Sequence, residues 1–104
     1  EVVWIMRDEQ TMAQVKEILA KISKVAPGKS VELRIPPYAA IQCVEGISHR
    51  RGTPPNVVEM NAKTLIELTE GSLNWAEGIK SGAIQASGVL SDLSRVFELV
   101  RISK

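Results

Sequence analysis

The densest polar cluster lies in the middle of the chain, where His49, Arg50 and Arg51 precede a turn rich in glycine and proline. Two guanidinium groups beside exposed backbone donors could hold a carboxylate or a phosphate, because the planar arginine fork matches paired oxygens. These three residues are therefore a candidate anion-binding site. A solvated loop whose arginines pair with Glu45 or Glu59 explains the same residues, since exposed ion pairs are common.

Cys43 and His49 are the sole candidates for a thiol nucleophile and its imidazole base. A single cysteine in an apolar stretch is usually a small buried hydrophobic residue, and the two positions meet only if the chain turns back between them. One histidine and one cysteine supply too few ligands for a metal, and the chain contains no glycine-rich phosphate-binding motif. We therefore expect no catalytic residue, no metal site and no cofactor.

Composition and net charge limit the classes of protein to which this chain can belong. The 104 residues carry a net charge of +1 and are 44% hydrophobic, which is ordinary for a globular domain and predicts no general attraction to nucleic acid. The single cysteine excludes an internal disulfide, and no apolar run approaches a membrane span. We expect one domain over 1–104, with 1–7 as an N-terminal extension, in a cytoplasmic protein without integral membrane association.

Hydrophobic periodicity predicts the elements of the first half. Apolar residues at three- and four-residue spacing indicate a helix capped by Asp8 and running to about Val25, whose apolar stripe most often covers a sheet. Alternation predicts a half-exposed strand over 30–35. The next strand, over 38–44, has apolar residues on both faces and is predicted to be central. Glycine and proline then predict a loop over 45–55, in which Ile47 to Arg50 could form a short hairpin arm.

The second half consists of short elements bounded by caps. A β-prone run at 57–60 leads to Asn61, which can cap a helix that Gly71 ends. Asn74 and Glu77 form a variant of the capping box and predict a further helix. These local signals predict a strand, two short helices and a returning strand in close succession.

The remaining signals complete the architecture. Gly82 ends the third predicted helix, a strand follows over 83–87, and Ser91 or Asp92 caps a closing helix. The chain thus contains four strands, or five, and four helices. We expect a single α+β domain with a four- to five-stranded, mainly antiparallel sheet covered by about four helices.

Three stretches of the second half resemble the sterol carrier protein superfamily. They are NVVEMN at 56–61, TLIELTEGSL at 64–73 and IKSGAIQASG at 79–88. The combination of RGTPPNVVE at 51–59 with LNWA at 73–76 is similar to its small single-domain bacterial branch, found chiefly in actinobacteria. The likeness covers 27–93 for the branch and 56–88 for the superfamily.

This resemblance implies a five-stranded sheet covered by helices, with an apolar tunnel or groove for a lipid. Members of the family bind or transfer sterols, fatty acids or acyl thioesters without catalysis. The resemblance places the ligand between sheet and helices, with Arg50 or Arg51 meeting a carboxylate head. The apolar lining is then drawn from Ile41, Cys43, Val58, Leu65, Leu68, Trp75, Ile84, Val96 and Phe97.

Two alternatives stay open. Trp75 could contact a ligand, although ordinary core or half-buried packing explains a lone aromatic of this kind. The chain could also be an interaction or dimerisation module that kept the scaffold and lost the tunnel. That second hypothesis predicts a filled core and an exposed apolar patch, either on the first helix or around Trp4.

Overall fold

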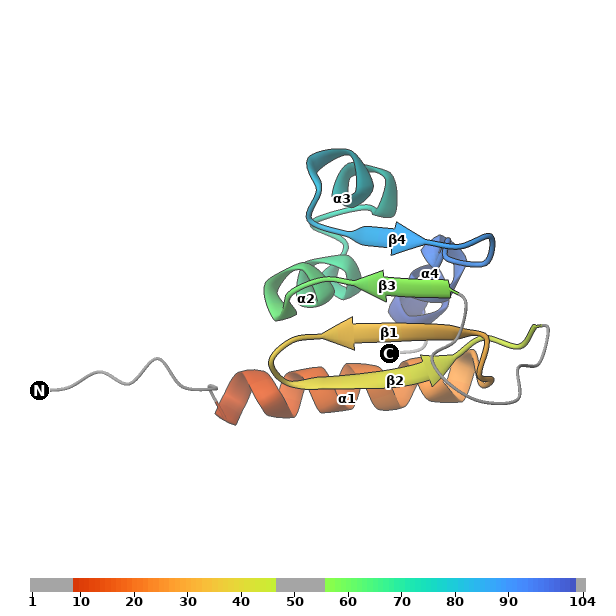
Figure 1. Ribbon diagram of the computed structural model, residues 1–104. Coiled ribbons are helices and arrows are strands. Elements are labelled where there is room, and N and C mark those ends of the chain that lie inside the picture. The colour runs from red at the N-terminus through yellow and green to blue at the C-terminus, as the bar shows by residue number, and fades with distance from the viewer. Residues whose placement is uncertain (1–8, 47–55, 103–104) are drawn as a thin grey trace, which may run out of the picture.

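A computed structural model describes residues 9–46 and 56–102. Several predictions fall outside these residues: the helix cap at Asp8, the lead-in with Trp4, and the cluster of His49, Arg50 and Arg51 with its hairpin arm. Within the described ranges the chain forms four helices and one sheet of four strands (Figure 1). The predicted fold class, α+β, is confirmed.

Helix α1 (Glu9–Val25) is the longest element and carries one apolar stripe, as its periodicity predicts. Glu9 in its first turn and Lys24 in its last complement the helix dipole. Pro27 lies two residues beyond the helix end and blocks its continuation. The buried members of the stripe are Val15, Ile18, Leu19 and Ile22.

The sheet is mixed, with strand order β2-β1-β3-β4. Strand β1 pairs antiparallel with β2 and parallel with β3, and β3 pairs antiparallel with β4. Two of the three pairings are therefore antiparallel, and a fifth strand is not among the described residues. The fourth strand is shorter than the predicted 83–87. The strands are β1 (Val31–Ile35), β2 (Ala39–Cys43), β3 (Asn56–Glu59) and β4 (Gln85–Ser87).

Strand β2 lies at an edge of the described sheet, so the prediction of a central strand is wrong. The turn at 36–38 returns the chain directly alongside β1, and β3 takes the other side of β1. Only Cys43 of β2 is buried, whereas Ala40 is exposed and Ile41 half-buried. Short alanine side chains make both faces of the strand look apolar while exposing little apolar surface.

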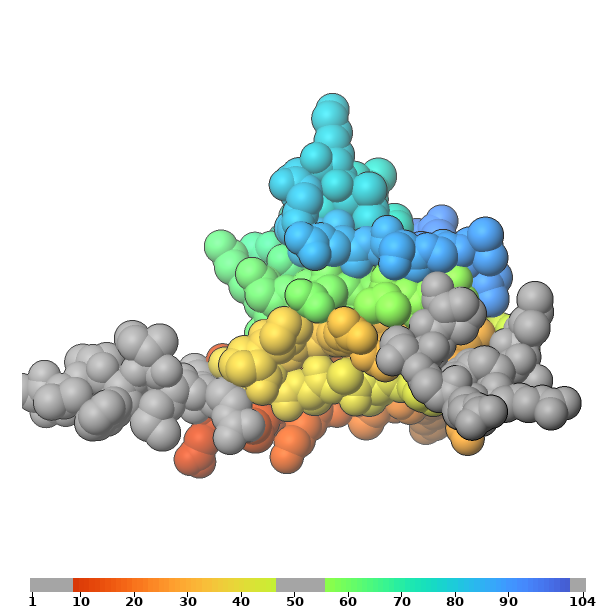
Figure 2. All heavy atoms as spheres, in the orientation of Figure 1, coloured from red at the N-terminus to blue at the C-terminus, as the bar shows by residue number. Residues whose placement is uncertain are grey.

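Helices cover one face of the sheet. Helices α1, α2 (Ala62–Glu70) and α4 (Ser94–Ile102) contact one another and lie behind the strands in Figure 1. Burial alternates along β1, so every second side chain enters the core between the layers. On the opposite face Glu32 and Arg34 form an ion pair. Figure 2 looks onto that face, where the strands lie side by side.

The caps of α2 and α3 (Trp75–Ser81) confirm the local signals in the sequence. The side-chain oxygen of Asn61 accepts a hydrogen bond from the backbone N–H of Thr64 at 2.8 Å. Gly71 and Gly82 end the two helices in the left-handed conformation, with φ of 88° and 84°. These glycines let the chain reverse twice within a few residues.

The starts of α3 and α4 are also held by side chains. Asn74 accepts from the N–H of Glu77 at 2.8 Å, and the Glu77 carboxylate accepts from the N–H of Asn74 at 3.2 Å, so the predicted capping box is confirmed. At α4 the carboxylate of Asp92 accepts from the N–H of Ser94 at 2.9 Å. Asp92 therefore satisfies the first N–H of the closing helix from the residue before Leu93, whose carbonyl accepts the first helical bond.

Candidate functional site

The nine residues predicted to line a ligand pocket belong to the apolar core or border it. Seven are buried, and Ile41 and Trp75 are partly buried against the same cluster. These side chains fill the space between sheet and helices by packing on one another. Only three of them reach the wall of a groove described below. The seven buried residues are Cys43, Val58, Leu65, Leu68, Ile84, Val96 and Phe97.

A groove of about 260 Å³, which we call the aromatic groove, opens between α2, α3 and α4. Small-molecule sites usually span roughly 300–1,000 Å³, so this groove suits one narrow apolar group. Its floor is apolar and its rim is polar. The lining residues are Leu68, Leu73, Asn74, Trp75, Ala76, Ser94, Phe97, Glu98 and Arg101.

Two stacked aromatic rings form the centre of this groove. The rings of Trp75 and Phe97 lie 6.0 Å apart with an interplanar angle of 27°. Trp75 is the first residue of α3, so the capping box before it sets its position. Gly78 keeps α3 close to the body of the protein, because a Cβ there would lie 2.3 Å from Cδ1 of Ile84. Trp75 itself is half-buried, as predicted.

Arg101 supplies the positive charge at the rim of the aromatic groove. Its guanidinium lies at the C-terminal end of α2, where a Cβ on Gly71 would come 3.3 Å from Nη1. Among the described residues, Arg101 forms no ion pair, whereas the other rim charge, Glu98, pairs with Arg95 at 3.3 Å. Arg101 was not predicted from the sequence. Its four-residue spacing from Phe97 on a helix is the signal that could have found it.

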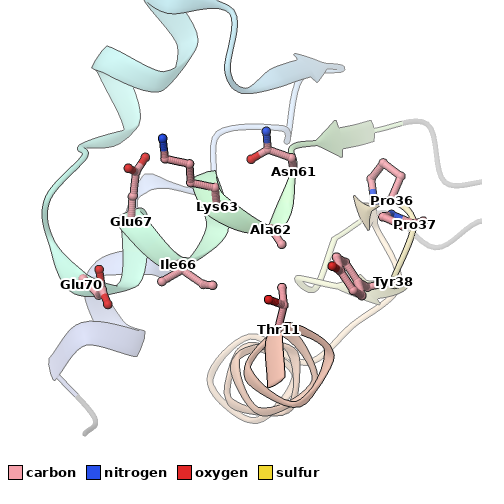
Figure 3. A pocket seen from close by; sticks show the side chains of 10 residues that line it. All are labelled: Thr11, Pro36, Pro37, Tyr38, Asn61, Ala62, Lys63, Ile66, Glu67 and Glu70. Atoms are coloured by element: carbon pink, nitrogen blue, oxygen red, sulfur yellow. The ribbon is translucent and has the colours of Figure 1, made fainter. Parts of the chain in front are cut away.

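A second and larger groove, of about 600 Å³, lies on the other side of α2 and was not predicted from the sequence. We call it the proline groove, because the turn between β1 and β2 forms one wall. Figure 3 shows Ala62 and Ile66 pointing from α2 toward Thr11 of α1, with Tyr38 across the gap. The lining residues are Thr11, Pro36, Pro37, Tyr38, Asn61, Ala62, Lys63, Ile66, Glu67 and Glu70.

The proline groove has an excess of negative charge at its rim. Glu67 and Glu70 stand along α2 with Lys63 one turn away (Figure 3). None of these three side chains forms an ion pair within the part of the chain that the structure describes. The proline groove therefore carries one formal negative charge in excess, whereas Glu98 and Arg101 balance at the rim of the aromatic groove.

The surroundings of Cys43 disfavour a role as a nucleophile. Its side chain is fully buried, and this burial raises the pKa of the thiol from 9.0 to about 11. Its predicted partner His49 lies outside the described residues.

In the described ranges no three potential metal ligands come together, and no helix has the length and apolar character needed to cross a membrane.

The exposed apolar side chains are not where a dimerisation patch was predicted. Across 9–46 and 56–102 the exposed large hydrophobic residues are Ile79, Val89 and Leu90, and none belongs to α1. The large apolar residues of α1 are buried or half-buried against the sheet and the other helices. The prediction of a patch on the first helix is therefore wrong, and Trp4 lies outside the described residues.

Comparison with known proteins identifies the scaffold. The family described as bacterial SCP ortholog matches residues 7–99. Among solved structures, "UbiJ-SCP2 Ubiquinone synthesis protein" superimposes with a TM-score of 0.52 and 12% identity, covering 96% of both chains. Sterol carrier protein 2 like 2 from Aedes aegypti gives 0.46 and 14%, covering 91% of this chain and 99% of that one. No curated protein sequence matches.

Proposed function

The chain belongs to the bacterial SCP ortholog family, and from that premise we propose that it is a non-catalytic binding protein for a ligand with one apolar chain and an anionic head. The aromatic groove is the proposed site. The carrying observation is the pair of stacked rings, Trp75 and Phe97, in a groove with a free guanidinium at its rim. Fatty acids and acyl esters have this chemistry.

The apolar floor supplies most of the proposed affinity. Burying 100 Å² of apolar surface contributes about 2.5 kcal/mol, less the cost of ordering a flexible chain. Leu68 and Phe97 are almost fully buried and form a rigid base, whereas Leu73 and Trp75 are half-buried and remain accessible to a ligand. A chain laid against Trp75 therefore finds a preformed surface.

Arg101 supports the choice of an anionic head. It lies on α4 one turn beyond Phe97, so a carboxylate at the end of a chain on the rings comes near its guanidinium. An exposed ion pair of this kind contributes roughly 0.2–1 kcal/mol. Arg101 would therefore favour an anionic head over a neutral one, while the apolar floor supplies most of the affinity. The buried, weakly acidic Cys43 supports the non-catalytic part of the proposal.

A titration with dodecanoate tests this proposal. Trp4 and Trp75 are the two tryptophans of the chain, so a Trp4→Phe variant reports on Trp75 alone. We expect dodecanoate, below its micelle concentration, to change Trp75 emission saturably and to raise the melting temperature. Leu73→Gln in the aromatic groove should weaken binding, while Ile66→Gln, a matched change of a half-buried residue in the proline groove, should not. Unchanged emission and melting temperature would remove the proposal.

A further inference from the structure

The proline groove is a hollow of small-molecule size that the proposed function leaves unused. Its volume of about 600 Å³ lies within the usual range of roughly 300–1,000 Å³ for small-molecule sites. Three elements distant in sequence form it: the first turns of α1, the turn between β1 and β2, and α2. In Figure 1 the start of α1, that turn and the start of α2 lie at the same end of the molecule.

An apolar stripe on α2 forms one wall of this groove. Ala62 and Ile66 are one helical turn apart, and Tyr38 lies across the gap from them (Figure 3). Ala62 is buried, whereas Ile66 and Tyr38 are half-buried and keep apolar surface that a ligand can cover. The stripe therefore offers a short apolar chain a surface on which to lie.

This stripe ends at a carboxylate. Glu70 lies one turn beyond Ile66, so positions 62, 66 and 70 follow one another along one side of α2 over about 12 Å. Glu70 is exposed and forms no ion pair with another described residue. A chain that lies on Ile66 thus brings its end group to Glu70.

The other described charges nearby leave Glu70 uncompensated. Lys63 and Glu67 stand one turn apart on the side of α2 away from α1, and their formal charges balance (Figure 3). Arg101 approaches the end of α2 at Gly71, but it lines the aromatic groove and makes no ion pair with Glu70. The excess negative charge of the proline groove therefore lies where the apolar stripe ends.

We propose that the proline groove binds a small amphiphilic amine, whose apolar chain lies against Ile66 and Tyr38 and whose ammonium group meets Glu70. A ligand with a carboxylate head is disfavoured there, because its charge would meet that of Glu70, and a neutral head gains nothing from the carboxylate. This second site does not depend on a ligand in the aromatic groove. The two binding proposals can therefore fail separately.

A titration with octylammonium chloride, followed at the backbone amides by NMR, tests this inference on the unmodified protein. We expect saturable shifts at Thr11, Lys63 and Ile66, with the amides of Trp75 and Ala76 unchanged. Added sodium chloride should weaken the binding of octylammonium, because it screens an exposed ion pair, and should not weaken that of octanol. Shifts centred on Trp75 and Ala76, or no shifts at millimolar octylammonium, would overturn the proposal.

Three variants test whether Glu70 meets the head group. Glu70→Gln should lower the affinity for octylammonium about two- to five-fold, the size expected for an exposed ion pair, and leave that for octanol unchanged. Glu17→Gln is the matched control, because Glu17 is an exposed carboxylate of α1 that lines neither groove. Lys63→Gln should raise the affinity for octylammonium, since it removes a cation from the rim. Equal losses for octylammonium and octanol in Glu70→Gln, or a weaker affinity for octylammonium in Lys63→Gln, contradict the assignment.

Discussion

The two grooves share α2 as a wall and differ in almost every other respect. On one side, Leu68 continues into a floor with stacked rings and a free guanidinium at the rim. On the other, Ile66 adjoins a wall of proline and tyrosine, and the rim carries free carboxylates. A nine-residue helix therefore borders two grooves of different character, one aromatic with a guanidinium from α4 at its rim and one with an excess of carboxylate. Volume alone would have selected the larger groove for a lipid, whereas charge and aromatic packing favour the smaller one.

The largest expected effect separates the floors of the two grooves. Phe97 is 3% exposed, so Phe97→Ala should lower the free energy of unfolding by about 3–5 kcal/mol. Ile66 is half-buried, and Ile66→Ala should cost roughly half as much or less, because part of its surface is already in water. Urea unfolding of both variants measures the difference. Equal losses would contradict the view that the aromatic groove has the more rigid floor.

The pH dependence of stability tests whether the core around Cys43 is closed to solvent. The pKa of Cys43 is about 11 in the folded protein and 9.0 for a free thiol. Between these values the unfolded chain loses the thiol proton and the folded one keeps it, so stability falls as pH rises. The difference in free energy of unfolding between the native protein and the Cys43→Ala variant should fall by about 2 kcal/mol from pH 8 to pH 11. A constant difference would indicate that water reaches the thiol.

Removing the N-cap of α2 or of α3 should destabilise the protein by nearly the same amount. Asn61 caps α2 beside the proline groove, and Asn74 caps α3 beside the aromatic groove. Alanine at either position should cost about 1 kcal/mol in thermal or urea unfolding. Only Asn74→Ala should also weaken dodecanoate binding, because it releases the start of α3 and hence Trp75. Equal loss of binding in both variants would show that the grooves are coupled.

The smallest expected effect concerns the rim cation. Arg101→Gln should lower the affinity for dodecanoate about two- to five-fold, the size expected for an exposed ion pair. Binding of dodecanol, which has the same chain and no charge, should not change. Lys80→Gln is the matched control, because Lys80 is an exposed cation on α3 that does not line the groove. A similar loss for both ligands would assign Arg101 a packing role instead.

Local signals in the sequence predicted the parts of the fold that depend on a few neighbouring residues. Asn61, Gly71 and the pair of Asn74 with Glu77 act within four residues of themselves, and each cap is present. Strand order depends on pairing between distant segments, which explains the wrong placement of β2. Asn56 is an example of such distant coupling: its amide donates to the carbonyl of Ser30 at 2.7 Å and accepts from the N–H of Leu90 at 2.9 Å.

The candidate sites were less predictable for a related reason. Periodicity indicates that residues such as Cys43 and Leu65 are buried, but it does not tell a face packed on other side chains from one packed on a ligand. The proline groove forms only where the turn at 36–38 meets α1 and α2. Arg101 becomes relevant only when α4 lies across the end of α2. Tertiary packing creates both features.

Mapping dodecanoate onto the backbone amides by NMR tests the central claim most directly, because it reports on both grooves at once. We expect saturable shifts concentrated at Trp75, Ala76 and Glu98, with the amides of Thr11 and Lys63 unchanged. Shifts centred on Thr11 and Lys63, or no shifts at saturating ligand, would contradict the assignment of the aromatic groove as the site.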